Sequence, residues 1–271
     1  MDDTSMIKLP DGRDLAVCQW GPRDGSPLFV LHGTPGSRYV RHPLGEYDRQ
    51  GIRAVTYDRP GYGRSTRISG RSNADTAGDV AAIADALGLE RFAVFGVSGG
   101  GPHALAAAAL LPDRVTRCAT VVGIEPADAE GLDYFDGMTD HEVTANRRAM
   151  ADAESYITEV EYLNVQQLLK DLDSADDLPE QVRLMLQVGL AQGPGGMIDE
   201  YVMSYTSWGF DLAGIQCPVT IMAAELDVPS QRHGSWLAAQ IPGAAYVVVP
   251  GGHFGPRDAE EEDLLGWLVR S

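Results

Sequence analysis

The sequence predicts an α/β fold, a mostly parallel sheet of eight strands flanked by helices, with a helical segment inserted into it. First, short apolar runs alternate with stretches of helical spacing at both ends of the chain, and such repeats build a parallel sheet covered on both faces. Second, this alternation stops between residues 125 and 210, where only helical spacing remains. We therefore expect a core of residues 1–124 and 211–271 and a helical cap of residues 125–210.

The elements of the core follow one another in a regular order. Apolar runs at residues 6–9 and 14–20 flank a Pro-Asp-Gly turn and are expected to pair as an antiparallel edge. The other predicted strands include residues 28–31, 53–57, 91–95, 118–122, 218–224 and 246–249. The predicted helices lie near residues 39–50, 74–87 and 101–111, with one more at the end of the chain and helical spacing in the cap at 155–171 and 180–190.

A serine flanked by glycines lies at one strand-to-helix corner. The motif Gly96-Val97-Ser98-Gly99-Gly100 follows the apolar run 91–95 and precedes the small-residue helix. A nucleophile elbow places its serine in strained backbone angles and leaves no room for neighbouring side chains, which is why the motif needs glycines. Ser98 is therefore the candidate nucleophile.

A serine hydroxyl is a weak nucleophile at neutral pH and needs a histidine base and a carboxylate that orients it. His253 follows the strand at 246–249, and Asp227 follows the strand at 218–224. Ligand chemistry gathers at such strand ends in an open parallel sheet. Two other carboxylates compete with Asp227 for the role of the acid: Glu125, which follows an earlier strand, and Glu225, which we interpret as a loop residue.

The chain resembles the α/β-hydrolase family over nearly its whole length. Besides the serine, acid and histidine in that order, residues 28–36 are similar to the family's strand and oxyanion loop, and residues 58–65 to its next strand-end loop. The resemblance implies Ser98 as nucleophile, His253 as general base and acid, and Asp227 as orienting acid. It also implies an oxyanion hole formed by the backbone N–H groups of Thr34 and Gly99, and a cap that covers the nucleophile and shapes the substrate pocket.

Several polar residues near these motifs are interpreted as structural. His32, beside the predicted oxyanion hole, is expected to brace its loop through hydrogen bonds, and His103 is expected to pack under the elbow. Asp58, Arg59 and Arg64 are expected to form a surface loop held by turn glycines and ion pairs, with little direct chemistry.

Charge and composition narrow the functional classes. The 271 residues carry a formal net charge of −18, and the predicted cap holds eighteen acidic against four basic residues. Nucleic acid is excluded as a partner and an anionic membrane is disfavoured, because phosphate groups attract basic surfaces. The acidic cap is interpreted as a solvated surface; a second hypothesis is that some of its carboxylates face the pocket and select a substrate with a protonated amine.

The apolar content of 44% allows one sizeable core, and the three cysteines show neither a disulfide pattern nor metal spacing. We find no apolar run of membrane-spanning length and no secretory signal, so a cytoplasmic protein is expected. No cofactor is expected either. The aspartates at 171–177 lack the turn glycine of a calcium loop, and no zinc or dinucleotide motif is present.

These observations predict a serine hydrolase that cleaves a small carboxylic ester by two-step acyl transfer. An aspartate nucleophile, as in dehalogenases and epoxide hydrolases of similar fold, is replaced here by Ser98. The alternatives are an iminopeptidase or amidase acting on an amine-bearing substrate, and a lyase or cyclase that reuses the same base. The partner is a small-molecule substrate; its identity and the oligomeric state are left open by the sequence.

Overall fold

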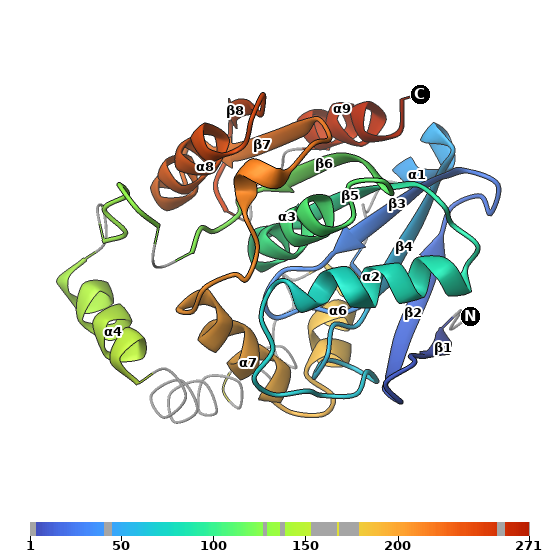
Figure 1. The fold of residues 1–271 in the computed structure, drawn as a ribbon, viewed down its shortest axis with the longest axis horizontal. Helices are drawn as coiled ribbons and strands as arrows, with labels where there is room; N and C mark the ends of the chain where they lie inside the picture. The colour runs from blue at the N-terminus through green and yellow to red at the C-terminus, as the bar shows by residue number, and fades with distance from the viewer. Residues whose placement is uncertain are drawn as a thin grey trace.

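The computed structural model describes residues 4–40, 45–126, 129–135, 139–152, 167, 179–253 and 258–270. Its centre is one sheet of eight strands in the order β1-β2-β4-β3-β5-β6-β7-β8 (Figure 1). The strands are β1 (Ser5–Lys8), β2 (Asp14–Trp20), β3 (Ser26–Leu31), β4 (Ile52–Tyr57), β5 (Phe92–Val97), β6 (Val115–Val121), β7 (Val219–Ala224) and β8 (Ala245–Val249). The pairs β1–β2 and β2–β4 are antiparallel, and the other five pairs are parallel. The predicted fold class and antiparallel edge are therefore confirmed.

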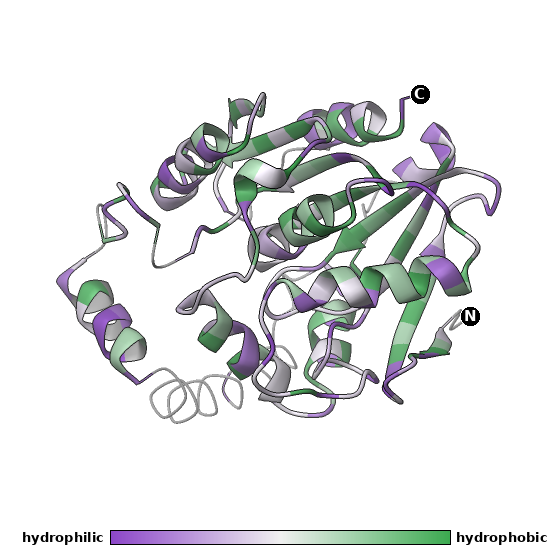
Figure 2. Ribbon diagram, in the orientation of Figure 1, coloured by the Kyte–Doolittle hydropathy of each residue, from purple (hydrophilic) through white to green (hydrophobic). Residues whose placement is uncertain are grey.

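Helices cover both faces of the sheet. One face packs against α2 (Asp75–Ala86), α3 (Gly101–Leu110) and α8 (Val228–Gln240), and the other against α1 (Glu46–Gln50) and α9 (Asp258–Val269). Each face of the sheet has its own hydrophobic core, and successive residues of β3 alternate between the two. Phe29 and Leu31 belong to the first core, Leu28 and Val30 to the second. This follows from the two-residue period of a strand. Figure 2 shows the hydrophobic residues concentrated in the strands accordingly.

One helix differs from its predicted bounds. Helical spacing predicts a helix from about residue 39, but α1 begins only at Glu46, after Gly45, whose φ of 68° lies in the left-handed region. A residue in that conformation does not continue a right-handed helix, so only the last turn of the predicted stretch is helical among the described residues.

The described part of the segment between β6 and β7 contains helices and loops and no strand. It contains α4 (Asp140–Ala151), α6 (Glu180–Gly189) and α7 (Gly195–Ser204). Helix α6 confirms the helical spacing seen at 180–190, whereas the stretch 155–171 lies outside the described residues except for residue 167. Helix α7 packs closely on the core. A Cβ atom on Gly61 would lie only 2.6 Å from the Cα of Gly196, so the two backbones meet without space for a side chain.

The three cysteines are not joined by disulfides in the described residues: Cys18 and Cys118 are buried, and Cys217 is partly buried. None of the described helices combines the length and the apolar content needed to span a membrane.

Candidate active site

The serine motif forms a sharp turn at the carboxyl end of β5. Ser98 has a φ of 51°, a conformation that non-glycine residues rarely adopt, and the 3-10 turn Ser98–Gly100 leads directly into α3. A Cβ atom on Gly96 would overlap the carbonyl oxygen of Gly100, and one on Gly100 would overlap that of Leu31. Glycine is therefore required at both positions by close backbone packing, and the serine is held at the edge of the sheet.

Three side chains predicted from the sequence meet at this edge. The Ser98 Oγ lies 3.0 Å from the Nε2 of His253, and the Nδ1 of the same ring lies 2.7 Å from the Oδ2 of Asp227. Asp227 also begins α8, where its Oδ1 accepts a hydrogen bond of 3.4 Å from the backbone N–H of Ser230. The helix start thus orients the carboxylate, and the carboxylate orients the imidazole.

The two competing carboxylates are placed elsewhere. Glu125 follows β6 and is fully buried, where it pairs with the Nδ1 of His233 from α8. Burial raises the pKa of Glu125, although His233 partly opposes this. Glu225 lies on the exposed loop after β7.

Thr34 and Gly99 lie side by side next to the serine. A Cβ atom on Gly99 would overlap the Thr34 Oγ1 and would lie 3.3 Å from the Thr34 backbone nitrogen. The structure therefore brings together the two residues whose N–H groups the resemblance assigns to an oxyanion hole. The bond between Thr34 and Pro35 is cis.

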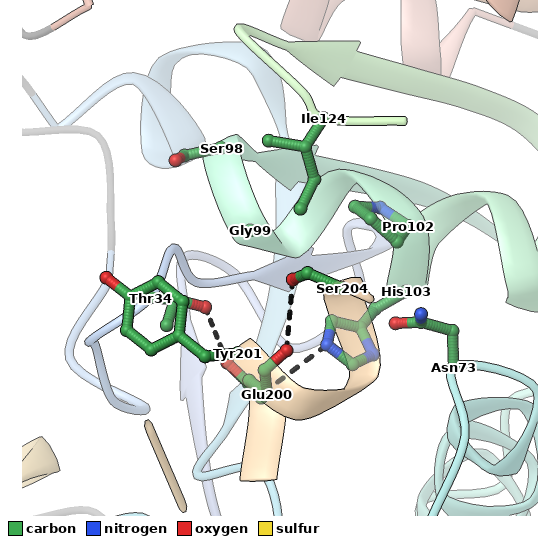
Figure 3. Close-up of a pocket in the computed structure, with 10 residues that line it drawn as sticks. All are labelled: Thr34, Asn73, Ser98, Gly99, Pro102, His103, Ile124, Glu200, Tyr201 and Ser204. Carbon is green, nitrogen blue, oxygen red and sulfur yellow. Dashed lines mark hydrogen bonds and ion pairs between the residues drawn. The ribbon is translucent and has the colours of Figure 1, made fainter. Parts of the chain in front are cut away.

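A cavity of about 130 Å³ opens beside Ser98. Its lining is apolar at Ile124 and Pro102 and polar at Asn73, His103, Glu200 and Ser204 (Figure 3). The cavity therefore has room for a small group next to the serine and offers it both apolar and hydrogen-bonding surface.

The carboxylate of Glu200, from α7, is the charged group of this wall that the sequence analysis did not single out. It is 5% exposed, and Figure 3 shows it joined to both Thr34 and His103. Its Oε2 accepts hydrogen bonds from Thr34 Oγ1 at 2.5 Å, from Arg59 Nη2 at 2.7 Å and from the Tyr62 hydroxyl at 2.9 Å. Its Oε1 pairs with Arg59 Nε and lies 3.4 Å from His103 Nε2.

Burial alone would raise the pKa of Glu200, but the charge and hydrogen bonds of Arg59, helped by His103, hold it well below its usual range. Glu200 is therefore ionised, and its acceptor positions are filled from within the protein.

The interpretation of Asp58 and Arg59 as surface residues is wrong. Both are fully buried. The Asp58 carboxylate accepts from the backbone and guanidinium of Arg38 and from the Arg64 N–H, while Arg59 reaches Glu200 and the carbonyl oxygens of the loop after β3. A polar loop next to a parallel sheet is buried here because the insertion covers it. Only Arg64 has an exposed side chain, as expected.

A family model described as "alpha/beta hydrolase fold" matches residues 26–258. The chain belongs to the α/β-hydrolase fold family. It is 27% identical to a bifunctional esterase/perhydrolase from Acinetobacter calcoaceticus over 97% of this chain and 98% of that protein. Its structure matches that of the esterase RhEst1 from Rhodococcus sp. ECU1013 with a TM-score of 0.70 at 20% identity, covering 99% of this chain and 100% of that one.

Shorter stretches match further relatives. A non-heme chloroperoxidase from Streptomyces lividans is 34% identical over 49% of each chain. A proline iminopeptidase from Xylella fastidiosa is 35% identical over 41% of this chain and 37% of the enzyme. The chain thus spans half or less of the length of these two relatives, and the family by itself does not select one reaction.

Within this α/β hydrolase, the two histidines interpreted as structural are buried and hydrogen-bonded. His32 Nδ1 lies 2.7 Å from the Gly33 carbonyl oxygen, and its Nε2 accepts from the backbone N–H of Arg59 at 3.4 Å. His103 Nδ1 lies 2.6 Å from the Thr76 hydroxyl. Burial, reinforced by the charge of Arg59, lowers the pKa of His32 well below its usual range and that of His103 to about 4. Both rings are neutral, and His103 also lines the cavity.

No group of three or more histidine, cysteine or acidic side chains that could hold a metal ion occurs in the described part of this hydrolase. The aspartates at 171–177 lie outside that part.

A weak signal for Arg59 was present in the sequence, and none for Glu200. Arg59 follows a parallel strand by two residues, a position at which ligand chemistry gathers. Glu200 is one of eighteen acidic residues in the insertion, and its neighbour Asp199 has the same chemistry on the same helix.

Proposed function

We propose that this protein is a serine hydrolase that cleaves a small carboxylic ester by two-step acyl transfer. The observation that carries the proposal is the unbroken hydrogen-bonded chain from the Ser98 hydroxyl through both ring nitrogens of His253 to Asp227. A hydroxyl in contact with an imidazole, which is itself oriented by a carboxylate, is the arrangement that activates serine as a nucleophile.

In the first step, Nε2 of His253 removes the proton of Ser98 as the oxygen attacks the ester carbonyl carbon. The backbone N–H groups of Thr34 and Gly99 stabilise the oxyanion, and the imidazolium then protonates the departing alcohol. Asp227 accepts the hydrogen bond of Nδ1–H and so fixes the tautomer with a free Nε2 lone pair. Water repeats the attack on the acyl-enzyme and releases the acid.

The cavity favours a short acyl group. We infer that the space of about 130 Å³ beside Ser98 accepts a small acyl group more readily than a long fatty acyl chain.

The amine-selecting alternative finds no support at Glu200, the acidic residue that lines the cavity beside Ser98. An iminopeptidase must offer an anionic group to the protonated amine of its substrate. Glu200 is ionised, but Arg59 neutralises it and its oxygens are already occupied by donors of the protein. Desolvating a second cation against a neutralised pair is unfavourable. We therefore place ester hydrolysis before amide hydrolysis, although a proline iminopeptidase is among the relatives.

The test uses p-nitrophenyl esters of increasing acyl length beside aminoacyl amides. We expect turnover of acetate and butyrate esters, a sharp fall for longer chains, and loss of about 10⁴-fold or more in kcat for Ser98→Ala. Ser207→Ala, an exposed serine outside the cavity, is the matched control and keeps wild-type rates.

A phosphonate that labels activated serines is measured in parallel. Labelling at Ser98 without ester turnover would favour the lyase or cyclase alternative, and turnover retained in Ser98→Ala would exclude the proposed nucleophile.

A further inference from the structure

We propose that Glu200 is a positioning residue for this reaction: through Thr34 and Arg59, it fixes the loop that supplies the Thr34 N–H to the oxyanion. This inference rests on the proposed function. It makes helix α7, which lies outside the sheet, part of the apparatus that shapes the oxyanion hole.

Arg59 supports the loop from the core side. It is fully buried, and its guanidinium donates to the carbonyl oxygens of His32 and, at 3.3 Å, of Gly33. Two consecutive carbonyl groups just before Thr34 are thus held by one rigid, planar group.

Glu200 completes this support from the insertion. Its carboxylate binds Arg59 through both oxygens and accepts the Thr34 hydroxyl at 2.5 Å. A buried guanidinium needs a counter-charge, so the Arg59 contacts to the loop depend on Glu200 as well. Tyr62 adds a hydrogen bond of 2.9 Å and so limits the movement of the carboxylate.

The position of Thr34 matters for catalysis because its side chain packs against the Cα of Gly99 and its backbone nitrogen lies close by. Moving the Thr34 hydroxyl would rotate or shift the N–H that the oxyanion requires. Oxyanion donors act through preorganised geometry, and displacements near 1 Å cost large factors in rate. Loss of the Glu200–Thr34 bond is therefore expected to lower kcat and to leave ester binding nearly unchanged.

The neighbouring residue provides a matched control. Asp199 makes a bidentate ion pair with Arg67 of the core, with distances of 2.8 and 2.9 Å, but its contacts do not include the loop of residues 32–34. Asp199 and Glu200 thus both join α7 to the core, one at the partly exposed rim and one at the oxyanion loop. If both residues only hold α7 on the core, their substitution should change kcat equally. If Glu200 positions Thr34, the two substitutions should change kcat to different extents.

The experiment compares Thr34→Val, Glu200→Gln, the double variant and Asp199→Asn on p-nitrophenyl acetate. Thr34→Val removes one hydroxyl and keeps the N–H, so it answers the question even if Glu200→Gln does not fold. We expect each of the first two to lower kcat by about tenfold with KM within about twofold, and the double variant to lose little more than either single one. Asp199→Asn stays within about twofold of wild type, and Thr34→Ser, which keeps the hydroxyl, restores the rate.

Binding of a trifluoromethyl ketone supplies a second measurement, because its adduct with serine carries the oxyanion. Its affinity should fall by the same factor as kcat in Thr34→Val. Independent, multiplicative losses in the double variant, a change confined to KM, or an equal loss in Asp199→Asn would overturn the inference. Failure of the proposed function is a different result: either the wild type does not hydrolyse the ester, or Ser98→Ala keeps the wild-type activity.

Discussion

Two histidine–carboxylate pairs lie past neighbouring strands of this sheet, and their surroundings differ. Asp227, after β7, orients His253, whose side chain is 33% exposed and whose other nitrogen reaches Ser98. Glu125, after β6, pairs with His233 in the same Nδ1-to-carboxylate manner, but it is completely buried and the Tyr134 ring stacks on the imidazole.

A histidine–carboxylate pair at a strand end is therefore not by itself evidence for a catalytic base. What distinguishes the first pair is that the far nitrogen of the ring contacts the Ser98 hydroxyl beside a cavity. The second pair joins the end of β6 to helix α8, the helix that begins with Asp227. We interpret the second pair as a structural link under the first.

Replacing each carboxylate by its amide gives the sharpest contrast. Asp227→Asn should lower kcat by about 10⁴-fold, because the amide can favour the wrong imidazole tautomer. Stability should change little, since asparagine also accepts the Ser230 N–H at the start of α8. Ester kinetics and thermal unfolding of the same preparation check both parts. Residual activity within tenfold of wild type would contradict the assigned acid.

Glu125→Gln should do the reverse. The substitution exchanges a charge-assisted hydrogen bond to His233 for a neutral one in a buried site, so we expect a loss of about 1–2 kcal/mol in the free energy of unfolding. Activity below the melting temperature should stay within about threefold. Denaturant unfolding and kcat are the measurements, and a loss of activity comparable to that of Asp227→Asn would show that Glu125 is the acid that matters.

Much of the fold could be predicted from the sequence, because its apolar residues recur with the periods of strands and helices. The strands from β3 to β8 are short and apolar, and the run of small residues at 101–110 forms helix α3. The glycines around Ser98 fixed the elbow locally, so the approach of His253 and Asp227 to Ser98 depended only on where two strand ends lie.

The supporting residues could not be predicted in the same way. Arg59 is buried against Glu200 of helix α7, which is separated from it by about 140 residues in the sequence. Glu200 differs from the other acidic residues of the insertion by its contact with Arg59, which lies far from it in the sequence. Periodicity and local motifs carry no information on such a pairing, whereas the buried guanidinium demands it once the fold is known.

A third histidine, His103, extends the comparison: it is buried and hydrogen-bonded to Thr76, and we interpret it as structural. The folded-state pKa of His103 is about 4, lowered by burial and by Arg59, whereas an unfolded histidine titrates near about 6.5. Between these values the unfolded chain binds a proton that the folded chain does not. Stability therefore rises with pH across this window and is fully present above it.

We accordingly expect His103→Gln to remove about 1 kcal/mol of the stability lost between about pH 6.5 and 5.5. His32, whose pKa is also lowered, accounts for part of the slope that remains. Glu200, with its lowered pKa, loses its contribution only below about pH 4.5, outside the window. Urea unfolding at several pH values measures the slope for wild type and variant. An unchanged slope would mean that His103 is protonated in the folded protein, and its contact with the Glu200 carboxylate would then be a full ion pair.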